Sequence, residues 1–440
     1  MKLLDKIKNK RLKVGIIGLG YVGLPLAIEF AKSGIETIGI DINGQKVSML
    51  NAGKSYIQDI DSQLIKHLVE KSKFTATNDF KAIASIDVVF VCVPTPFNKA
   101  KAPDISFMIN AAKSISSYLS KEKLIVLQST TYPGTTDEDI IPILEQSGLK
   151  AGKDFYIAFS PERIDPGNKK FNVKNTPKIV GGLTLKCADL TKRVFSLIID
   201  EKNIHVVSCP RSAEMCKLLE NIFRSVNIAL VNELLILSNR MGIDFWEVID
   251  AAATKPFGFL PFYPGPGVGG HCIPVDPYYL SWKAREYNFF ANFIELAAEV
   301  NQNMPYYAVE KIGEALNLQN KSLKNATVFI LGLTFKKNID DIRNSPSFEI
   351  IKLLLNKGAK VWGFDPYVNH YEAAAKEYDL KGDIHFIPLT KANLKKADAV
   401  AILVNHDKFN LKMIADNSKV LIDMINAAKY LNKYKNIIKL

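Results

Sequence analysis

Cysteine is scarce in this sequence, and long apolar runs are absent from it. The 440 residues include five cysteines, an odd number whose spacing matches no zinc or disulfide framework and favours reduced thiols. No uninterrupted apolar stretch approaches the ~20 residues that cross a bilayer. The basic N-terminus is followed by an apolar stretch, as in a signal peptide, but glycines break this stretch and no small-residue cleavage site follows. We therefore expect a cytoplasmic protein with no membrane partner.

Blocks of like charge are missing as well. The formal net charge is +12, but the lysines are scattered along the chain and form no basic segment. An anionic small ligand and a nucleic acid would both suit such a charge, and charge alone does not separate them. The composition, with 48% hydrophobic and 23% charged residues, is that of an ordinary globular protein. The length indicates two or three domains.

Short apolar runs alternate with amphipathic helical patterns in the first half of the chain. This alternation predicts a parallel, doubly wound α/β sheet. A second α/β module begins after Lys324, with a helix at 347–357 that ends at Gly358. The expected strands of the two modules are 13–17, 37–41, 88–93, 124–128, 155–159 and 178–181, then 326–331, 360–364, 399–404 and 420–423.

Helical patterns separate the two modules. The first runs from Ser212, a possible N-cap, to Met241 and stops at Gly242, which makes it unusually long. A second helical block is expected at 281–316. Between them, residues 255–277 are crowded with proline, glycine and aromatic residues, and a loop of this length is either disordered or functional. Because disordered segments are poor in aromatics, we interpret it as an ordered active-site loop.

A glycine-rich turn lies between the first expected strand and the helix that follows it. Gly18, Gly20 and Gly23 form a GxGxxG pattern, and Asp41 ends the second strand. Gly18 would permit the tight turn, Gly20 the approach of backbone N–H groups to a pyrophosphate, and Gly23 close packing of helix on strand. Asp41 would accept hydrogen bonds from ribose hydroxyls and repel a 2′-phosphate, which favours NAD over NADP. The alternative is that the glycines serve only tight packing. The order of strand, glycine turn, helix, second strand and aspartate along the chain disfavours this alternative.

Cys272 is the strongest candidate for a nucleophile. It follows the glycine turn 269–270, where the backbone can approach a ligand and the thiol can point into a cleft. A structural thiol is the alternative, whereas a zinc site with the neighbouring histidine lacks a second ligand pair. Lys217 and Asn221 share one face of the long helix and could polarise one oxygen and hold one water, although a solvated helix face is the commoner meaning. Cys92, which ends an apolar strand, is interpreted as core filling.

Seven stretches of the chain carry a more specific signal when they are taken together. They are GIIGLGYVGLPLA, VCVPTP, QSTTYPGTT, FSPERIDPG, AEMCKLLEN, PGVGGHCIPVDPYYL and GLTFKKNIDDIRNSP. In this order they resemble the UDP-sugar 6-dehydrogenases, the family that acts on UDP-glucose, UDP-N-acetylglucosamine and UDP-N-acetylmannosamine. The resemblance covers essentially the whole chain, and it is more specific for the family than for the sugar.

The resemblance implies a domain organisation. It consists of two Rossmann-like, doubly wound parallel-sheet domains joined by a long central helix. The implied regions are 1–205 for NAD binding, 206–317 for a central helical dimerisation region with the catalytic loop, and 318–440 for UDP-sugar binding. The family also implies a homodimer formed around the long helix, whose apolar positions cover more than one stripe.

The resemblance further implies roles for individual residues. The catalytic roles are those of Cys272 as nucleophile, Lys217 at the oxyanion, Asp276 with Lys217 on a water, Thr130 in positioning that water, Glu162 in thioester hydrolysis and Asn221 in substrate contact. The implied cofactor contacts are Gly18, Gly20, Tyr21, Val22, Gly23, Asp41, Pro94, Thr95, Thr130 and Arg343. The implied substrate contacts are Glu162, Arg163, Lys217, Asn221, Tyr263, Gly269, Phe335 and Lys336.

The implied reaction is a twofold oxidation of the C6 hydroxyl of a UDP-hexose by NAD. Cys272 captures the aldehyde as a thiohemiacetal, the second oxidation leaves a thioester, and water hydrolyses the thioester to the uronate. UDP-N-acetylglucosamine is the expected substrate, with UDP-glucose and UDP-N-acetylgalactosamine still open. A two-electron hydroxyacid-type dehydrogenase and a non-catalytic nucleotide-binding regulator are the more remote alternatives.

Two positions depart from the family pattern. Pro166 stands where simple UDP-glucose dehydrogenases have a second acidic residue, after the Glu162 equivalent. Ile425 stands where the family commonly has the arginine of an Asp-x-Arg-Asn run. The source of that positive charge is therefore left open.

Overall fold

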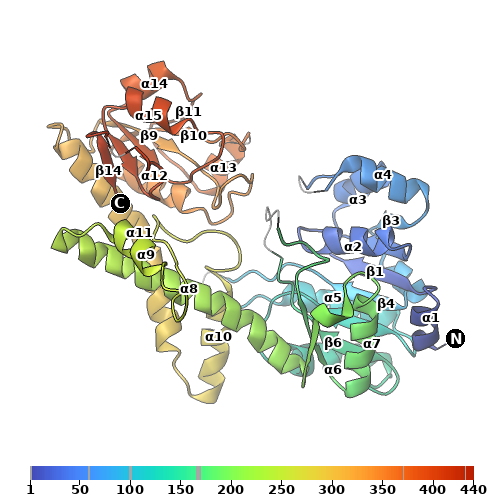
Figure 1. The fold of residues 1–440 in the computed structure, drawn as a ribbon. Helices are drawn as coiled ribbons and strands as arrows, with labels where there is room; N and C mark the ends of the chain where they lie inside the picture. The colour runs from blue at the N-terminus through green and yellow to red at the C-terminus, as the bar shows by residue number, and fades with distance from the viewer. Residues whose placement is uncertain (1, 58–59, 99–101, 165–169, 370, 432) are drawn as a thin grey trace. The chain divides into compact units, whose positions relative to one another are not determined.

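The computed structural model describes residues 2–57, 60–98, 102–164, 170–369, 371–431 and 433–440, and Figure 1 shows the course of the chain. Pro166 lies outside these residues. The chain divides into two compact units. Unit 1 contains Met1–Glu220 and Tyr278–Phe289, and unit 2 contains Asn221–Pro277 and Phe290–Leu440.

Unit 1 is built on an eight-stranded sheet with the order β3-β2-β1-β4-β5-β6-β7-β8. The strands are β1 (Lys13–Ile17), β2 (Glu36–Ile40), β3 (Phe74–Thr77), β4 (Val88–Val91), β5 (Leu124–Leu127), β6 (Tyr156–Phe159), β7 (Lys178–Gly182) and β8 (Ile204–Val207). Its helices are α1 (Leu3–Lys8), α2 (Gly23–Lys32), α3 (Gly44–Asn51), α4 (Ser62–Glu70), α5 (Ser106–Ser117), α6 (Ile141–Leu144) and α7 (Leu185–Phe195).

Both faces of this sheet are buried. Along β4, Val88 and Phe90 belong to one core cluster, whereas Val89 and Val91 belong to another. Successive side chains of a strand point to opposite faces, so each cluster packs on its own face. Continuous apolar runs such as this one are typical of parallel strands covered on both sides, and the predicted doubly wound sheet is confirmed.

One strand pair of unit 1 corrects the prediction of a parallel sheet. β6 and β7 are antiparallel, whereas the other neighbouring strands are parallel. A parallel pair needs a long crossover, usually a helix, and the described residues between β6 and β7 form none. β3 and β8 were not predicted, because both are short and carry exposed residues.

Unit 2 contains a second, wholly parallel sheet with the order β11-β10-β9-β12-β13-β14. In chain order this is 3-2-1-4-5-6, the arrangement of dinucleotide-binding domains. The strands are β9 (Thr327–Leu331), β10 (Lys360–Phe364), β11 (Ile384–Phe386), β12 (Ala399–Ile402), β13 (Leu421–Asp423) and β14 (Ile437–Lys439). The helices are α9 (Phe245–Ala252), α11 (Asn292–Asn317), α12 (Pro346–Asn356), α13 (Tyr371–Glu377), α14 (Lys391–Lys396) and α15 (Leu411–Asn417). The short outer strands β11 and β14 were not predicted.

The long helix α8 (Pro210–Met241) carries the chain from unit 1 into unit 2. It begins at Pro210, so the predicted N-cap at Ser212 is wrong; proline is favoured in the first turn, where its missing N–H group has no helical partner. It ends where Gly242 takes a φ of +72°, as predicted. Within the described residues, α8 alone is long and apolar enough to cross a membrane. Core helices of soluble proteins reach the same length and apolar composition.

The second helical block is two helices, so the single block predicted at 281–316 is wrong. The helix α10 (Asp276–Ala284) is followed by a short 3₁₀ turn and then by α11. Asn288 takes a left-handed φ of +54° between them, and asparagine tolerates this conformation better than most residues. The helical periodicity of the sequence continues through the break, which hid it.

Asp398 joins three donors of unit 2 in front of β12. Its carboxylate accepts a hydrogen bond from the N–H group of Thr327 at 3.0 Å and pairs with Lys419 at 3.1 Å and with Lys321. Burial by itself would raise the pKa of Asp398, but these donors outweigh it and hold the pKa at about 2. A carboxylate whose pKa is lowered by folding stabilises the fold at pH values above its pKa in the unfolded chain. This contribution is lost as the pH falls through the pKa of the folded state.

We expect Asp398→Asn to lower the free energy of unfolding at neutral pH by about 1 kcal/mol, less than the full linkage value because solvent screens the two half-exposed lysines. Between about pH 4 and pH 2, the wild type should lose stability that the variant has already lost. Urea unfolding at neutral pH and at about pH 3 measures both effects. Asp189→Asn, in an exposed ion pair on α7, is the control, and equal acid sensitivity of wild type and Asp398→Asn would contradict the assignment.

Candidate active site

The glycine-rich turn after β1 has the geometry of a pyrophosphate site. Gly18 takes a φ of +90°, its N–H group donates to the carbonyl of Ile40 at 2.8 Å, and a Cβ there would stand 2.6 Å from the carbonyl oxygen of Cys92. A Cβ at Gly23 would stand 1.9 Å from the carbonyl oxygen of Gly18, so α2 packs directly on the turn. No heavy atom lies within 4 Å of a Cβ placed at Gly20. This side of the turn is open to a ligand, at the N-terminus of a helix that favours anions.

Asp41 is buried beside this turn, directly after β2. Its Oδ2 accepts a hydrogen bond from the N–H group of Leu19 and its Oδ1 from that of Asn43, both at 2.9 Å. An ionised carboxylate has about four acceptor positions, so two remain for hydroxyl groups. The hydroxyl of Tyr56 donates to the carbonyl of Leu19. Burial, and then the charge of Asp41, raise the pKa of Tyr56, which therefore stays a neutral donor; no sequence motif marked it.

Two strand ends meet next to this turn in unit 1. Thr95 follows β4 and Thr130 follows β5, and the hydroxyl of Thr95 donates to the carbonyl of Thr130 at 2.7 Å. Tyr279 is buried, and its hydroxyl donates a hydrogen bond to the carbonyl of Thr95. The carboxyl ends of parallel strands line the ligand crevice of doubly wound sheets. Thr95, Thr130 and the adjacent Pro94 are therefore where a nicotinamide site would lie.

Glu214, near the start of α8, holds the loop that follows Thr130. Its carboxylate accepts hydrogen bonds from the N–H groups of Gly134 at 2.7 Å and Thr136 at 3.0 Å, and from the Thr136 hydroxyl at 2.6 Å. Burial raises the pKa of Glu214, although these donors oppose the rise. No sequence motif marked this residue, because a single glutamate in the first turns of a helix is common.

Glu162 forms a buried ion pair with Lys178 of β7. The Nζ of Lys178 lies 2.8 and 2.7 Å from the two carboxylate oxygens of Glu162, and the lysine side chain is fully buried. The Oε1 of Glu162 also accepts hydrogen bonds from the N–H groups of Arg163 at 2.8 Å and Ile164 at 3.0 Å. The carboxylate is thus fixed in one orientation. Lys178 was missed because it stands at the start of an apolar strand, where a lysine usually reaches solvent.

Two further residues near this pair are engaged within the protein. The guanidinium of Arg163 donates to the carbonyl of Pro177 at 2.9 Å and pairs with Glu220 at 2.7 Å, which ties the 160s segment to α8. Cys92 is buried, and burial followed by the charge of Glu162 raises the pKa of its thiol. A buried neutral thiol is unreactive, in agreement with its interpretation as core filling.

The predicted nucleophile lies in unit 2, at the turn that leads into α10. The carbonyl of Cys272 accepts hydrogen bonds from the N–H groups of Val275 at 3.0 Å and Asp276 at 2.8 Å. The side chain of Asn221 donates to the carboxylate of Asp276 at 2.5 Å, and both residues are buried. Lys217, one turn earlier on α8 and in unit 1, is buried too. This face of the helix is therefore not a solvated face.

The glycines before Cys272 allow the loop 255–277 to pack on unit 2. A Cβ at Gly269 would stand 2.6 Å from the Cβ of Phe335, and Gly270 takes a φ of +86°. The N–H group of Gly270 donates to the carbonyl of Arg343 at 3.1 Å, and Asn344 donates to the carbonyl of Gly270 at 3.1 Å. At these glycines the backbone thus approaches other residues of the protein, where an approach to a ligand was expected. These contacts make the loop an ordered one.

Unit 2 also contains a cavity of about 250 Å³. Phe335 and Lys336, two of the implied substrate contacts, line it together with Lys337. Ile425 lines it as well, so the residue in place of the family's usual arginine is apolar, and the two lysines supply the positive charge. The other lining residues are Gly265, Pro266, Gly267, Thr334, Pro346, Ser347, Leu403, Val404 and Asn405.

Two residues that were expected to contact a ligand interact with other residues of unit 2. Tyr263 stacks on Trp246 and donates to Asp250 at 3.1 Å. The guanidinium of Arg343 binds both oxygens of Asp341, with its Nη2 at 2.6 Å. Neither Tyr263 nor Arg343 is among the described residues that line the cavity.

The turn at Gly18, the carboxylate of Asp41 and the second doubly wound sheet define an NAD-dependent dehydrogenase with a separate domain for its substrate. The chain belongs to the UDP-glucose/GDP-mannose dehydrogenase family. The NAD binding domain of this family matches residues 12–199, its central domain matches 211–303, and its UDP binding domain matches 329–430. The protein is therefore an NAD-dependent UDP-sugar dehydrogenase, as the sequence motifs predicted.

Individual relatives match along nearly the whole chain. A UDP-N-acetyl-D-glucosamine 6-dehydrogenase of Pseudomonas aeruginosa is 37% identical over 94% of this chain and 97% of that relative. One of the same name from Salmonella typhi is 38% identical over 90% of each. The solved structure of a UDP-D-ManNAc dehydrogenase from Pyrococcus horikoshii has a TM-score of 0.84 and 32% identity, and the match covers 94% of this chain and 96% of that chain.

The geometry of Asp41 predicts the choice of cofactor. We expect Asp41→Ser to lower the ratio of kcat/KM with NAD to kcat/KM with NADP by at least about tenfold, since a carboxylate repels a 2′-phosphate. Steady-state kinetics with both cofactors measures this ratio. Asp5→Ser, an exposed change on α1, should leave it unchanged. Equal wild-type efficiency with NAD and NADP would show that Asp41 does not select the cofactor.

Proposed function

We propose that this enzyme oxidises UDP-N-acetyl-D-glucosamine at C6 to UDP-N-acetyl-D-glucosaminuronate and so supplies polysaccharide or glycan biosynthesis. The two relatives at 37% and 38% identity carry this activity in their names. Relatives at 33% and 34% identity are named for UDP-N-acetyl-D-mannosamine and for NDP-N-acetyl-D-galactosaminuronic acid, so these sugars, with UDP-glucose, are the alternatives.

The observation that carries the proposed chemistry is the position of Cys272 at the turn into α10, in the same unit as the buried Asn221–Asp276 pair. Bound NAD supplies the hydride acceptor for both oxidations, so one sugar reduces two molecules of NAD. The thiolate of Cys272 adds to the C6 aldehyde and forms a thiohemiacetal. After the second oxidation the sugar is held as a thioester, which water cleaves to the carboxylate and the free thiol. Covalent capture keeps the aldehyde from escaping.

Proton handling falls to groups that the fold already orients. Asn221 holds the carboxylate of Asp276 at 2.5 Å, and we assign to this oriented carboxylate the role of general base toward the hydrolytic water. We assign to the Lys217 ammonium the stabilisation of the oxyanion, because a fixed cation is most effective where charge develops. Thr130, whose carbonyl is held by Thr95, orients the water.

Glu162 acts as a fixed acceptor in the hydrolysis step. Lys178 balances its charge, and two backbone N–H groups fix its Oε1. A carboxylate held by these donors keeps one orientation, and its remaining lone pairs can accept a hydrogen bond from the hydrolytic water. The ion pair thus makes Glu162 a positioning residue, and the general base role is assigned to Asp276.

The cavity of unit 2 is the proposed site of the UDP moiety. Phe335 offers an aromatic ring, and Lys336 and Lys337 offer point charges for a diphosphate. Because Ile425 is apolar, no arginine at that position contributes. Tyr263, Gly269 and Arg163 stay predicted substrate contacts, and Tyr21, Val22 and Arg343 stay predicted cofactor contacts.

Replacement of the nucleophile tests the covalent mechanism. We expect Cys272→Ser to slow uronate formation by at least ~1000-fold, because a serine hydroxyl is a far weaker nucleophile than a thiolate, while UDP and NADH still bind. Cys209→Ser, at another partly exposed thiol, is the matched control and should keep its activity.

A panel of substrates tests the choice of sugar and the number of oxidations. NADH formation with the UDP-sugars of GlcNAc, GalNAc, ManNAc and glucose should be most efficient with GlcNAc and should give two NADH per sugar. One NADH per sugar would favour a two-electron dehydrogenase.

We also propose a homodimer formed around α8. An isologous two-fold contact is the commonest symmetry among soluble oligomers. The apolar side chains that α8 exposes are Met215, Leu219, Phe223, Leu230, Leu234, Leu237 and Met241. A cytoplasmic location remains a prediction, to be tested by cell fractionation.

Substitution on α8 tests the dimer. Leu230→Glu should shift the mass in light scattering from twice the chain mass to 49.0 kDa and lower activity with it, because a buried glutamate at an apolar contact is costly. Leu185→Glu changes an even more exposed leucine, at the start of α7, and should alter neither. A fully active wild-type monomer would exclude the dimer.

A further inference from the structure

The two sheets carry the same strand-end arrangement. The N–H group of Gly18 donates to Ile40 at the end of β2, and that of Gly332 donates to Phe364 at the end of β10, at 2.8 and 2.9 Å. Both glycines are left-handed, with φ of +90° and +89°. In each sheet an aspartate follows directly and binds the backbone of the facing turn. Asp365 thus occupies in unit 2 the place that Asp41 occupies in unit 1.

Asp365 differs from Asp41 in what faces it. Its Oδ2 accepts hydrogen bonds from the N–H groups of Leu333 at 2.7 Å and Thr334 at 3.2 Å, and His406 Nε2 lies 2.9 Å from the same oxygen. The side chains of Asp365 and His406 are both fully buried. Burial by itself would raise the pKa of Asp365, but the hydrogen bonds from His406 and the backbone outweigh it. The carboxylate is thus a buried anion whose Oδ2 is bound by the backbone and by His406.

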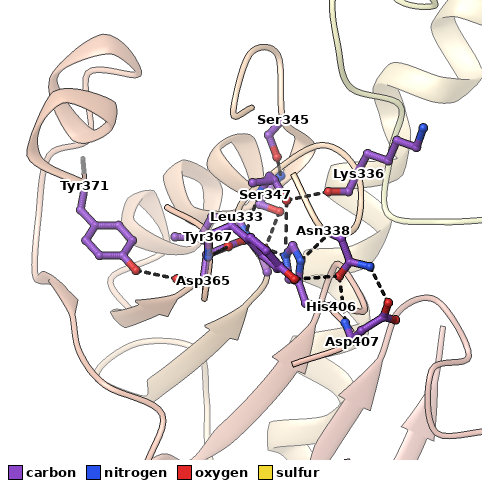
Figure 2. A network of polar contacts seen from close by, with 12 residues as sticks. Leu333, Lys336, Asn338, Ser345, Ser347, Asp365, Tyr367, Tyr371, His406 and Asp407 are labelled. Atoms are coloured by element: carbon purple, nitrogen blue, oxygen red, sulfur yellow. Dashed lines mark hydrogen bonds and ion pairs between the residues drawn. The ribbon is translucent and has the colours of Figure 1, made fainter. Parts of the chain in front are cut away.

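The hydrogen bonds of His406 define its tautomer. The N–H group of Asn338 points at His406 Nδ1 from 3.0 Å, and a backbone N–H can only donate. Nδ1 therefore carries a lone pair, and the ring proton lies on Nε2 and is donated to Asp365. The imidazole thus uses both nitrogens, one toward the end of β10 and the other toward the loop after β9, as Figure 2 shows.

The loop that His406 holds is a wall of the cavity. Thr334, Phe335, Lys336 and Lys337 line the cavity, and so does Asn405, the residue before His406. In Figure 2 the backbone carbonyl of Lys336 joins the network while its side chain extends away from the His406 ring. The hydroxyl of Thr334 makes this bond to the Lys336 carbonyl, at 2.8 Å.

A second clamp joins the same two segments. Asn338 donates through its side chain to Asp407 at 2.6 Å and accepts from the N–H group of Asp407 at 3.0 Å. Asn338 also takes a left-handed φ of +62°, which reverses the chain at the end of the loop. The backbone from Thr334 to Asn338 is therefore fixed at both ends, and Phe335 and Lys336 project from it.

We propose that His406 and Asp365 are positioning residues for substrate binding: the pair holds the loop 334–338 in the shape that presents Phe335 and Lys336 to the UDP moiety. This inference rests on the proposed binding of UDP in the cavity of unit 2. The inference gives Asp365, which follows β10 as Asp41 follows β2, a use other than ribose binding. The carboxylate is used to fix the loop through His406, and the nucleotide is bound by the loop itself.

Two amide substitutions at His406 test the hydrogen bonds of its two ring nitrogens one at a time. The glutamine amide of His406→Gln reaches the position of Nε2 and can still donate to Asp365, but it offers no acceptor at the position of Nδ1. The asparagine amide of His406→Asn places its oxygen near Nδ1 and can still accept from Asn338. We expect His406→Gln to raise the Kd of UDP and the KM of the UDP-sugar about tenfold, the size of one lost buried hydrogen bond. The rise in His406→Asn should be smaller, while kcat and the KM of NAD stay within about twofold in both.

The measurements are calorimetric titration with UDP and with NADH, steady-state kinetics, and thermal unfolding of each variant. His385→Gln, at an exposed histidine of β11 that pairs with Asp383, is the matched control and should bind UDP as the wild type does. If His406→Gln does not fold, Asp407→Ala tests the other clamp at an exposed position and should also weaken UDP binding with kcat unchanged.

Three results would overturn the inference, and they are distinguishable. A folded His406→Gln, or a folded Asp407→Ala in its place, that binds UDP as tightly as a UDP-binding wild type would exclude the positioning role and leave the proposed function intact. A wild type that shows no UDP binding and turns over the sugar without it would remove the proposed function together with the inference. A parallel loss of UDP binding, NADH binding and kcat would point to a general structural role and would also exclude the proposal.

Discussion

One peptide N–H group at the end of the first strand fixes the ligand-binding end of each sheet. In unit 1 it belongs to Gly18 and in unit 2 to Gly332, and both bind the carbonyl at the end of the neighbouring strand. A side chain at either glycine would collide with backbone atoms of the next strand connection. With the turn placed in this way, its next N–H groups reach the carboxylate of Asp41 or Asp365. The glycine-rich turn of unit 1 and the cavity loop of unit 2 both depend on this constraint.

Carboxylates fix most of the functional loops. Asp41, Glu162, Glu214, Asp365 and Asp423 each accept two or more hydrogen bonds from backbone N–H groups of a turn. Several donors that converge on one carboxylate hold the backbone of the turn in one conformation, so each loop is organised before a ligand arrives. Preorganised dipoles are an effective means of stabilising developing charge. Lysine side chains, although numerous in the sequence, make few of the contacts that hold these loops.

The sequence predicted the parts of the fold that depend on local pattern. The turn at Gly18, the strand β1 and the end of α8 follow from glycine positions and from period-two or helical periodicity, and they were placed correctly. The antiparallel β7 could not be foreseen, because strand direction depends on the path of the connection and not on the residues of the strand. The break at Asn288 lies inside a continuous helical pattern and was missed for the same local reason.

The candidate site was predicted less completely. Motifs made Asp41 and Cys272 candidates, because their neighbours in sequence carry the signal. Lys178 and His406 carry none, since each acts on a residue that is distant along the chain. Their partners, Glu162 and Asp365, become neighbours only when strands from separate segments pair. A single sequence contains no local trace of such a contact, and only the fold reveals it.

The Glu162–Lys178 pair constrains how this protein can evolve. Loss of either member alone leaves an uncompensated charge in the interior, at a cost of about 3–5 kcal/mol, whereas replacement of both together can be nearly neutral. Such a cost is a large fraction of the stability of a typical domain. The two codons are therefore expected to change in concert or not at all. A substitution of the carboxylate is therefore expected to persist only together with one that removes the charge of Lys178.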